Sequence, residues 1–298
     1  MLSYAIDESF LVPADDIGRE KMKRRIFEKH GYDETRIIAR SILSRPIEAY
    51  FIGDGKRSII VFATHHALES ICTNIAFLLI DTLLSGNVKR VINTIDCKLL
   101  LSKYRFIIVP CVNPDGVEMR FNGPLDSPLL ERQMRMSNGD FSIWQANARG
   151  VDLNHNYDAG FFEYIAFMRR SGIEPGATLW GGEYPESEPE TRGVANLIRV
   201  MSPSAVISLH SQGEEIYAYP EVQRVMRVAT KLSNMTGYKI SHASGSAAYS
   251  GLSNYAGALG IPSFTYEVGR GKNPLSENLI GDIFYRIAES IIILPTLI

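Results

Sequence analysis

The sequence lacks any uninterrupted apolar stretch long enough to cross a bilayer. Its longest apolar segments, residues 71–84 and 291–298, are broken by polar residues or too short. Residues 1–18 mix acidic and apolar side chains and have neither the basic start nor the continuous apolar run of a signal peptide. We therefore expect a protein that does not use a membrane as a partner.

An excess of one charge is also missing. The 298 residues include 31 Lys and Arg against 33 Asp and Glu, and the net charge is only -2. Such a balance gives no field that would gather nucleic acid, so we expect a locally bound small partner instead. With 45% hydrophobic residues, the chain is long enough to bury a large core.

Cysteine is scarce and widely spaced. Cys72, Cys97 and Cys111 form no close pattern and lie in apolar surroundings. This argues against a disulfide framework and against a Cys-ligated metal, and it favours buried free thiols. A reducing compartment is predicted, and we expect the protein to be cytoplasmic.

Two common groups of enzymes leave no signature in the sequence. Gly269-Arg270-Gly271 lacks the third glycine and the following helix start of a dinucleotide-binding loop, and no Walker-type loop occurs. The Gly-x-Ser-x-Gly elbow of many serine hydrolases is also missing. Nucleotide binding and serine-based hydrolysis are therefore not supported.

Apolar periodicity predicts strands that alternate with helices. A hairpin is expected from residues 47–52 and 58–64, because Gly53-Asp54-Gly55 lies between them. Residues 105–112 predict a buried strand that stops at a turn over 113–116, and residues 118–160 predict long loops. Further strands are expected over residues 205–209 and 263–268, and helices over residues 16–29, 68–84, 188–201, 222–235 and 276–293.

This order predicts an α/β fold with a mixed, largely parallel central sheet and helices on both faces. No repeat, low-complexity tract or long linker divides the chain. We expect one catalytic domain over residues 1–298, in which residues 1–35 form a helical extension packed on the rest.

Histidine and glutamate occur where buried strands end. His66 and Glu69 lie three residues apart after one strand, and His210 ends another. Carboxyl ends of parallel strands are where open α/β sheets place ligands, so the three residues could form a two-His, one-carboxylate metal site. Taken alone, the pattern leaves a structural role equally open, and His65 competes with His66 as the ligand.

Seven ordered motifs resemble the zinc carboxypeptidase family, from about residue 37 onward. They are His-x-x-Glu at His66 and Glu69, Asn113 to Gly116, Arg149 to Asn156, Ser187 to Thr191, Leu209 to Gly213, Phe264 to Gly269, and Asn273 to Leu275. The resemblance implies the zinc carboxypeptidase fold, of the phosphorylase/hydrolase-like type, and one Zn²⁺ ion held by His66, Glu69 and His210.

The same resemblance implies roles for residues around the metal. Glu267 matches the family's general base, and Arg149 matches the arginine that polarises the scissile carbonyl. Without the resemblance, Glu267 would be read as a partner of Arg270 or Lys272, and Arg149 as a solvated loop residue. Asp152 is expected to orient a ligand imidazole, although a turn-stabilising aspartate is an equal alternative.

Substrate-binding positions depart from the family pattern. Asn154 and His155 fall where relatives have Asn-Arg, the pair that grips a terminal carboxylate. Histidine weakens such a bidentate clamp, which puts simple exopeptidase activity in doubt. Tyr249 is our candidate for the family's mobile tyrosine, with Tyr255 as the second choice.

The wording of the motifs resembles bacterial peptidases that cleave γ-D-glutamyl-diaminopimelate bonds in cell-wall peptides. A small muropeptide-like substrate is therefore expected, while the oligomeric state and side-chain preference stay open. An ordinary carboxypeptidase or a small-amide deacylase is the alternative. A silent peptide-binding module is a further hypothesis, which the retained metal set and Glu267 disfavour.

Overall fold

A computed structural model describes residues 6–89 and 94–298 of the chain. One eight-stranded sheet forms its centre. In spatial order the strands are β1 (Thr35–Arg40), β2 (Pro46–Ile52), β6 (Tyr104–Val109), β3 (Arg57–Ala63), β7 (Ala205–His210), β10 (Ser263–Glu267), β8 (Glu215–Tyr219) and β9 (Lys239–Ile240). A separate pair consists of β4 (Asn87–Lys89) and β5 (Thr94–Asp96).

The four central strands β6, β3, β7 and β10 run parallel, β2 and β8 pair antiparallel with β6 and β10, and β1 pairs antiparallel with β2. Such a sheet must be covered on both faces. The predicted mixed, largely parallel sheet with helices is therefore confirmed.

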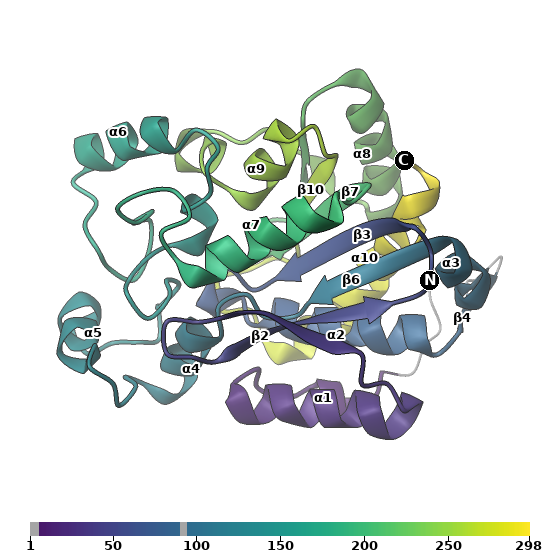
Figure 1. The fold of residues 1–298 in the computed structure, drawn as a ribbon, viewed down its shortest axis with the longest axis horizontal. Coiled ribbons are helices and arrows are strands. Elements are labelled where there is room, and N and C mark those ends of the chain that lie inside the picture. The colour runs from purple at the N-terminus through teal and green to yellow at the C-terminus, as the bar shows by residue number, and fades with distance from the viewer. Residues whose placement is uncertain (1–5, 90–93) are drawn as a thin grey trace.

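Ten α-helices lie in the described part of the chain, and Figure 1 shows α7 crossing one side of the strands and α1 lying outermost beside α2. They are α1 (Asp16–His30), α2 (Ile71–Leu84), α3 (Cys97–Lys103), α4 (Pro114–Asn122), α5 (Leu130–Ser137), α6 (Phe161–Ser171), α7 (Pro189–Met201), α8 (Gln223–Thr236), α9 (Leu252–Ala258) and α10 (Ile280–Ile293). None of the described helices is both long enough and apolar enough to span a membrane.

Strand β3 shows how the sheet divides the core. Ile59 and Val61 point into the cluster that contains α2, α8 and α10, whereas Ile60 and Phe62 point into the cluster under α7 and α9. Alternation sends successive side chains to opposite faces, so a strand buried on both faces reads as a continuous apolar run. This arrangement holds the carboxyl end of β3 rigidly.

The predicted hairpin over residues 47–52 and 58–64 is wrong. β6 lies between β2 and β3, antiparallel to β2 and parallel to β3. The chain therefore leaves β2, passes through Gly53-Asp54-Gly55 and skips one position in the sheet. β1 and β2 form the antiparallel pair instead. A local turn signal could not reveal a strand that arrives fifty residues later in the chain.

The predicted turn over residues 113–116 is also wrong, because these residues begin α4. Asn113 caps the helix, since its Oδ1 accepts a hydrogen bond from Gly116 N at 3.0 Å, and Pro114 occupies the first turn. The Asn113 side-chain amide donates to the carbonyls of His65, Gln145 and Ala146. The predicted loops over 118–160 likewise contain the rest of α4 and all of α5.

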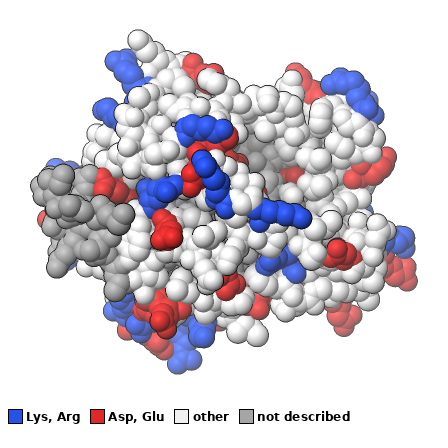
Figure 2. Space-filling view, turned by 180° about the vertical axis from the view of Figure 1, so that it is seen from behind, with Lys and Arg blue, Asp and Glu red and all other residues white. Residues whose placement is uncertain are grey.

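Charged side chains of both signs are interspersed over the face seen in Figure 2. This agrees with the balanced composition. The helical extension predicted over residues 1–35 contains α1, and residues 1–5 of it lie outside the described residues. Asp15 caps α1 by accepting from Gly18 N, and Gly31 ends it in the left-handed conformation.

Candidate metal centre

The predicted ligands meet where β3 and β7 end side by side. These strands pair in parallel as far as Ala63 and Leu209. Beyond β3, Thr64 takes the left-handed conformation with a φ of 58°, which breaks the strand alternation. A short 3₁₀ turn over Ala67–Glu69 then brings Glu69 back beside His66.

His66, Glu69 and His210 form one cluster. The Nδ1 atom of His66 lies 2.9 Å from Glu69 Oε1, and the Nδ1 atom of His210 lies 2.8 Å from Glu69 Oε2. Each residue offers a ligand atom within 4.8 Å of the others. The three side chains that the sequence singles out are therefore brought together.

Charge within the cluster suits a cation. Burial alone would raise the pKa of Glu69, but His66 and His210 lower it to about 2. Burial alone would lower the pKa of His66, but the carboxylates of Glu69 and Asp152 outweigh it and raise that pKa well above its usual range. The carboxylates of Glu69 and Asp152 that favour a proton on His66 would equally favour a metal ion in its place.

These residues fit a zinc ion. Each of the two Glu69 oxygens faces an imidazole Nδ1, so the ligand atoms of all three residues lie close together. Two imidazoles and one carboxylate are a donor set that zinc accepts while it keeps a fourth position open.

Asp152 contacts the cluster through the ring nitrogen of His66 that faces away from Glu69. Its Oδ1 lies 3.0 Å from His66 Nε2, and its Oδ2 accepts from Leu179 N at 3.1 Å. When a metal replaces the proton on Nδ1, Asp152 would keep the proton on His66 Nε2 and so leave the Nδ1 lone pair for the ion. The contact matches the orienting role that the sequence predicts for Asp152.

His65, the competing histidine, faces away from Glu69. Its Nε2 lies 2.8 Å from the Tyr157 hydroxyl, and its ring stacks on His210 with the centroids 5.6 Å apart. Burial lowers the pKa of His65 well below its usual value, and the neighbouring His210 adds to that effect. His65 is thus a neutral residue that packs behind a candidate ligand.

Glu267 lies beside the cluster, because β10 pairs with β7 so that Glu267 and His210 are neighbours. Together with His66 and His210 it lines a cavity of about 150 Å³, named here the strand-end cavity. Burial raises the pKa of Glu267 to about 7, against the opposing effect of His210. Arg270, its alternative partner, pairs with Glu214 at 3.2 Å.

Asn154 and His155 also line the strand-end cavity. His155 stacks on Tyr164 at 4.2 Å between centroids, and its Nδ1 lies 3.1 Å from the Tyr249 carbonyl. Burial lowers the pKa of His155 despite the carboxylate of Asp152. A neutral, stacked imidazole therefore stands at the position where relatives have an arginine.

Arg149 and Tyr249 are not brought to the cluster. The Arg149 guanidinium binds the buried carboxylate of Glu188 at 2.7 and 3.0 Å, and it lines a different cavity. The Tyr249 ring packs against Gly160, and the side chain is not among those lining the strand-end cavity. Their catalytic roles stay predictions. The second choice, Tyr255, accepts a hydrogen bond from Arg199 at 2.8 Å.

Sequence reasoning missed several residues of the strand-end cavity. Tyr217 and Tyr219 come from β8, Ser253 and Asn254 from α9, and Thr265 from β10. The alternation of apolar and polar residues over Glu215–Tyr219 could have indicated a strand. In such a strand Tyr217 and Tyr219 share one face.

Two imidazoles and a carboxylate at parallel strand ends, next to a half-buried glutamate, define a metal-dependent hydrolase centre. The sequence model of the zinc carboxypeptidase family matches residues 32–291. The chain therefore belongs to the zinc carboxypeptidase family and is a metallopeptidase.

Relatives support the same family. The chain is 32% identical over 249 residues to gamma-D-glutamyl-L-diamino acid endopeptidase 1 of Lysinibacillus sphaericus, which covers 80% of this chain and 61% of that protein. It is 31% identical over 123 residues to murein peptide amidase A of Escherichia coli K12, covering 39% of this chain and 41% of that one. The chain thus spans about three-fifths of the first relative and less of the second.

A solved structure supports the fold. The crystal structure of thrombin activatable fibrinolysis inhibitor superposes with a TM-score of 0.75 at 20% identity, covering 98% of this chain and 75% of that one. At this identity, the likeness establishes the shared fold and nothing finer.

Proposed function

We propose that the protein is a zinc-dependent peptidase that hydrolyses an amide bond in a small cell-wall peptide, namely the γ-D-glutamyl-diamino acid bond. The observation that carries the catalytic part is the convergence of His66, Glu69 and His210 at the cavity that Glu267 lines. Similarity to a gamma-D-glutamyl-L-diamino acid endopeptidase and to a murein peptide amidase supports the substrate class.

One Zn²⁺ ion would be held by His66, Glu69 and His210, and when bound it would polarise the scissile carbonyl and make a water acidic. The protein residues prepare this chemistry. Asp152 fixes the ring of His66, and His65 packs against the ring of His210. Both imidazoles are therefore held in place before a substrate arrives.

Glu267 moves the proton. With a pKa raised to about 7, its carboxylate accepts a proton from the attacking water near neutral pH and can return it to the departing amine. A glutamate with an ordinary pKa would be a weaker acid–base pair for this exchange. Burial in the strand-end cavity thus sets Glu267 for both halves of the reaction.

The strand-end cavity favours a peptide that does not depend on a charged clamp at its terminal carboxylate. None of the described residues that line it is a lysine or an arginine, and His155 is held neutral. Its polar surface comes from amides and hydroxyls, such as those of Asn154, Tyr217 and Thr265. Recycled wall fragments in the cytoplasm would be the natural substrate of a protein in that compartment.

Incubation of the zinc-loaded protein with L-Ala-γ-D-Glu-diaminopimelate tests the proposal. We expect the release of free diaminopimelate, which chromatography of the reaction mixture detects. Elemental analysis should find one zinc ion per chain. A plain dipeptide blocked at its amino end serves as the comparison substrate. Cleavage of the plain dipeptide without release of diaminopimelate would reject the cell-wall substrate while retaining the peptidase.

An ordinary carboxypeptidase is the second candidate, and membership of the family favours it. It predicts hydrolysis of plain C-terminal residues, which the comparison substrate detects. A small-amide deacylase predicts cleavage of an N-acyl amino acid instead. If none of these substrates is cleaved by protein that holds zinc, the enzymatic proposal itself is rejected.

A further inference from the structure

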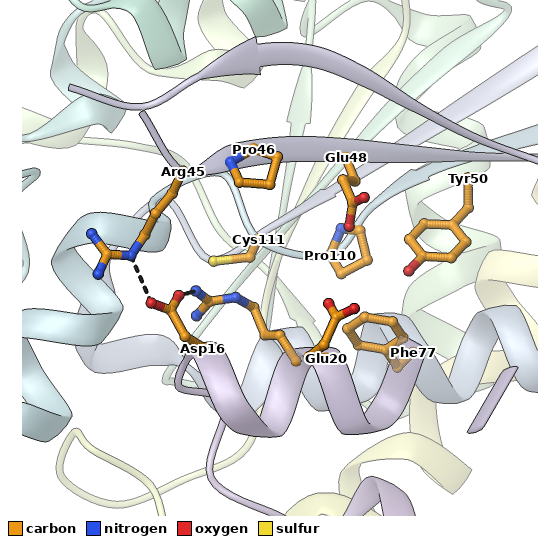
Figure 3. Close-up of a pocket in the computed structure, with 10 residues that line it drawn as sticks. Asp16, Glu20, Arg45, Pro46, Glu48, Tyr50, Phe77, Pro110 and Cys111 are labelled. Carbon is orange, nitrogen blue, oxygen red and sulfur yellow. Dashed lines mark hydrogen bonds and ion pairs between the residues drawn. The ribbon is translucent and has the colours of Figure 1, made fainter. Parts of the chain in front are cut away.

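A second cavity lies under the N-terminal helix, away from the metal centre. Its volume is about 290 Å³, and it is enclosed by α1, β2, α2 and the segment that follows β6 (Figure 3). It shares no lining residue with the strand-end cavity. Because α1 ends at His30, the helix lies before residue 32, where the family match begins. We call this space the helix cavity.

Positive charge in the helix cavity is already neutralised. Arg45 binds Asp16 at 2.8 Å and Asp115 at 3.1 Å. Arg19 pairs with Asp16 and also donates to the carbonyl of Ala14. The two guanidinium groups thus have carboxylate partners. Figure 3 shows Arg45 and Asp16 with Cys111 towards one side of the cavity. An anionic ligand would have to displace these partners.

The other side of the cavity has acceptors to spare. The Tyr50 hydroxyl is buried, the residue is 1% exposed, and no hydrogen-bond partner for it exists among the described residues. Figure 3 shows the carboxylates of Glu20 and Glu48 on the same side as this hydroxyl. Glu48 uses one oxygen for Lys23, whereas the Glu20 carboxylate makes no hydrogen bond or ion pair with the described residues.

An unpaired buried hydroxyl is costly, so its survival in a fold points to a partner that the protein chain does not supply. Two carboxylates beside it select a donor that carries positive charge. Phe77 and Pro110 provide apolar walls next to these groups. An aromatic ring and a proline suit methylene groups, and an aromatic face also attracts a cation.

We propose that the helix cavity binds a small organic ammonium, that is, a primary ammonium group on an aliphatic chain. The ammonium group donates to the Tyr50 hydroxyl oxygen and to the carboxylates of Glu20 and Glu48. The methylene groups lie against Phe77 and Pro110. This site is separate from the metal centre and does not depend on the proposed peptidase reaction.

Calorimetric titration of the zinc-loaded protein with 1,5-diaminopentane tests the proposal. We expect saturable binding of one molecule per chain. Tyr50→Phe should weaken it about tenfold, because a hydrogen bond to a charged group is lost. Glu20→Gln should weaken it by a similar factor. Glu28→Gln, a change of the same charge on the same helix outside the cavity, should leave the affinity unchanged.

Two further probes separate the ammonium from the rest of the ligand. Pentan-1-ol keeps the aliphatic chain without the charge, and glutarate carries the opposite charge, so neither should show saturable binding. Absence of saturable binding of the diamine would overturn the proposal. Equal affinity in Tyr50→Phe would also overturn it, since the amine would then lie elsewhere, for example at the zinc ion.

Glu20→Gln protects the test against misfolding. Glu20 is exposed on α1, so its substitution leaves the core intact even if Tyr50→Phe were to disturb packing. An equal loss of affinity in Glu20→Gln and Glu28→Gln would show attraction by general negative charge, and it would reject a built site.

Discussion

The strand-end cavity and the helix cavity are each lined by a residue with a buried polar atom that has no partner in the described residues: His210 with its Nε2, and Tyr50 with its hydroxyl. Their surroundings differ. In the strand-end cavity, two imidazoles meet one carboxylate and a further glutamate has a raised pKa. In the helix cavity, the arginines are paired with carboxylates, while the carboxylate of Glu20 has no such partner among the described residues and lies near an aromatic wall.

This difference suits the strand-end cavity for catalysis and the helix cavity for ligand binding alone. Groups that exchange protons at neutral pH need pKa values displaced towards 7, and the strand-end cavity displaces that of Glu267. The helix cavity has the means to hold a ligand but no candidate acid, base or nucleophile set. Experiments on matched side chains in the two cavities can break or sharpen this division.

The largest effect is expected from Glu267→Gln. The amide cannot accept the proton of water, so kcat should fall by a factor of roughly 10² to 10⁴. Zinc content should stay unchanged, because Glu267 is not one of the three ligands. Steady-state kinetics with elemental analysis measures both. The same exchange in the helix cavity, Glu20→Gln, should leave kcat unchanged, and a retained kcat in Glu267→Gln would remove Glu267 from the mechanism.

A smaller effect is expected from Asp152→Asn. This change weakens the hold on His66 Nε2, and the affinity for zinc should fall by about 10- to 100-fold. Competition with a coloured chelator measures the affinity. Glu20→Gln again serves as control and should bind zinc as the parent does. Parent-like zinc affinity in Asp152→Asn would reduce Asp152 to a structural residue.

A third cavity, lined by Arg149, provides an intermediate case. Arg149→Ala removes two donors from the buried Glu188, so the free energy of unfolding should fall by about 1–3 kcal/mol. Arg149 is 38% exposed in its side chain, which favours the lower half of that range. Urea unfolding measures the change.

Arg135→Ala is the matched control for Arg149→Ala, because Arg135 is largely exposed and lies 3.8 Å from an exposed glutamate. The free energy of unfolding of Arg135→Ala should differ from that of the parent by less than about 0.5 kcal/mol. Kinetics on the folded Arg149 variant then decides its predicted catalytic role. A kcat/KM within a few-fold of the parent would assign Arg149 to stability alone.

The smallest effect concerns two buried tyrosines. Tyr50→Phe removes an unpaired hydroxyl and should raise the free energy of unfolding by about 1 kcal/mol in the absence of any amine. Tyr157→Phe removes a hydroxyl that is bonded to His65 Nε2 at 2.8 Å, and it should lower that energy by a similar amount. Thermal unfolding compares them. Losses of equal size in both would mean that Tyr50 is already satisfied.

The metal cluster could be predicted because the resemblance to the family supplied the ligand set, whereas spacing alone left a structural role equally open. His66 and Glu69 lie three residues apart after a strand, and His210 ends another apolar run. The sheet order could not be predicted, because β6 enters between β2 and β3 through contacts that no turn signal records. Arg149 and Glu188 are likewise far apart in the chain, so their pairing is invisible in either motif.

Asn113 bears on which residues near the metal centre can be substituted during evolution. Its amide holds three carbonyl groups, those of His65, Gln145 and Ala146, at 3.0 to 3.1 Å. A carbonyl belongs to the backbone, so any residue type offers it equally well. The identity of residues 145 and 146 therefore does not decide whether these hydrogen bonds form, whereas replacement of the single asparagine would release three segments at once.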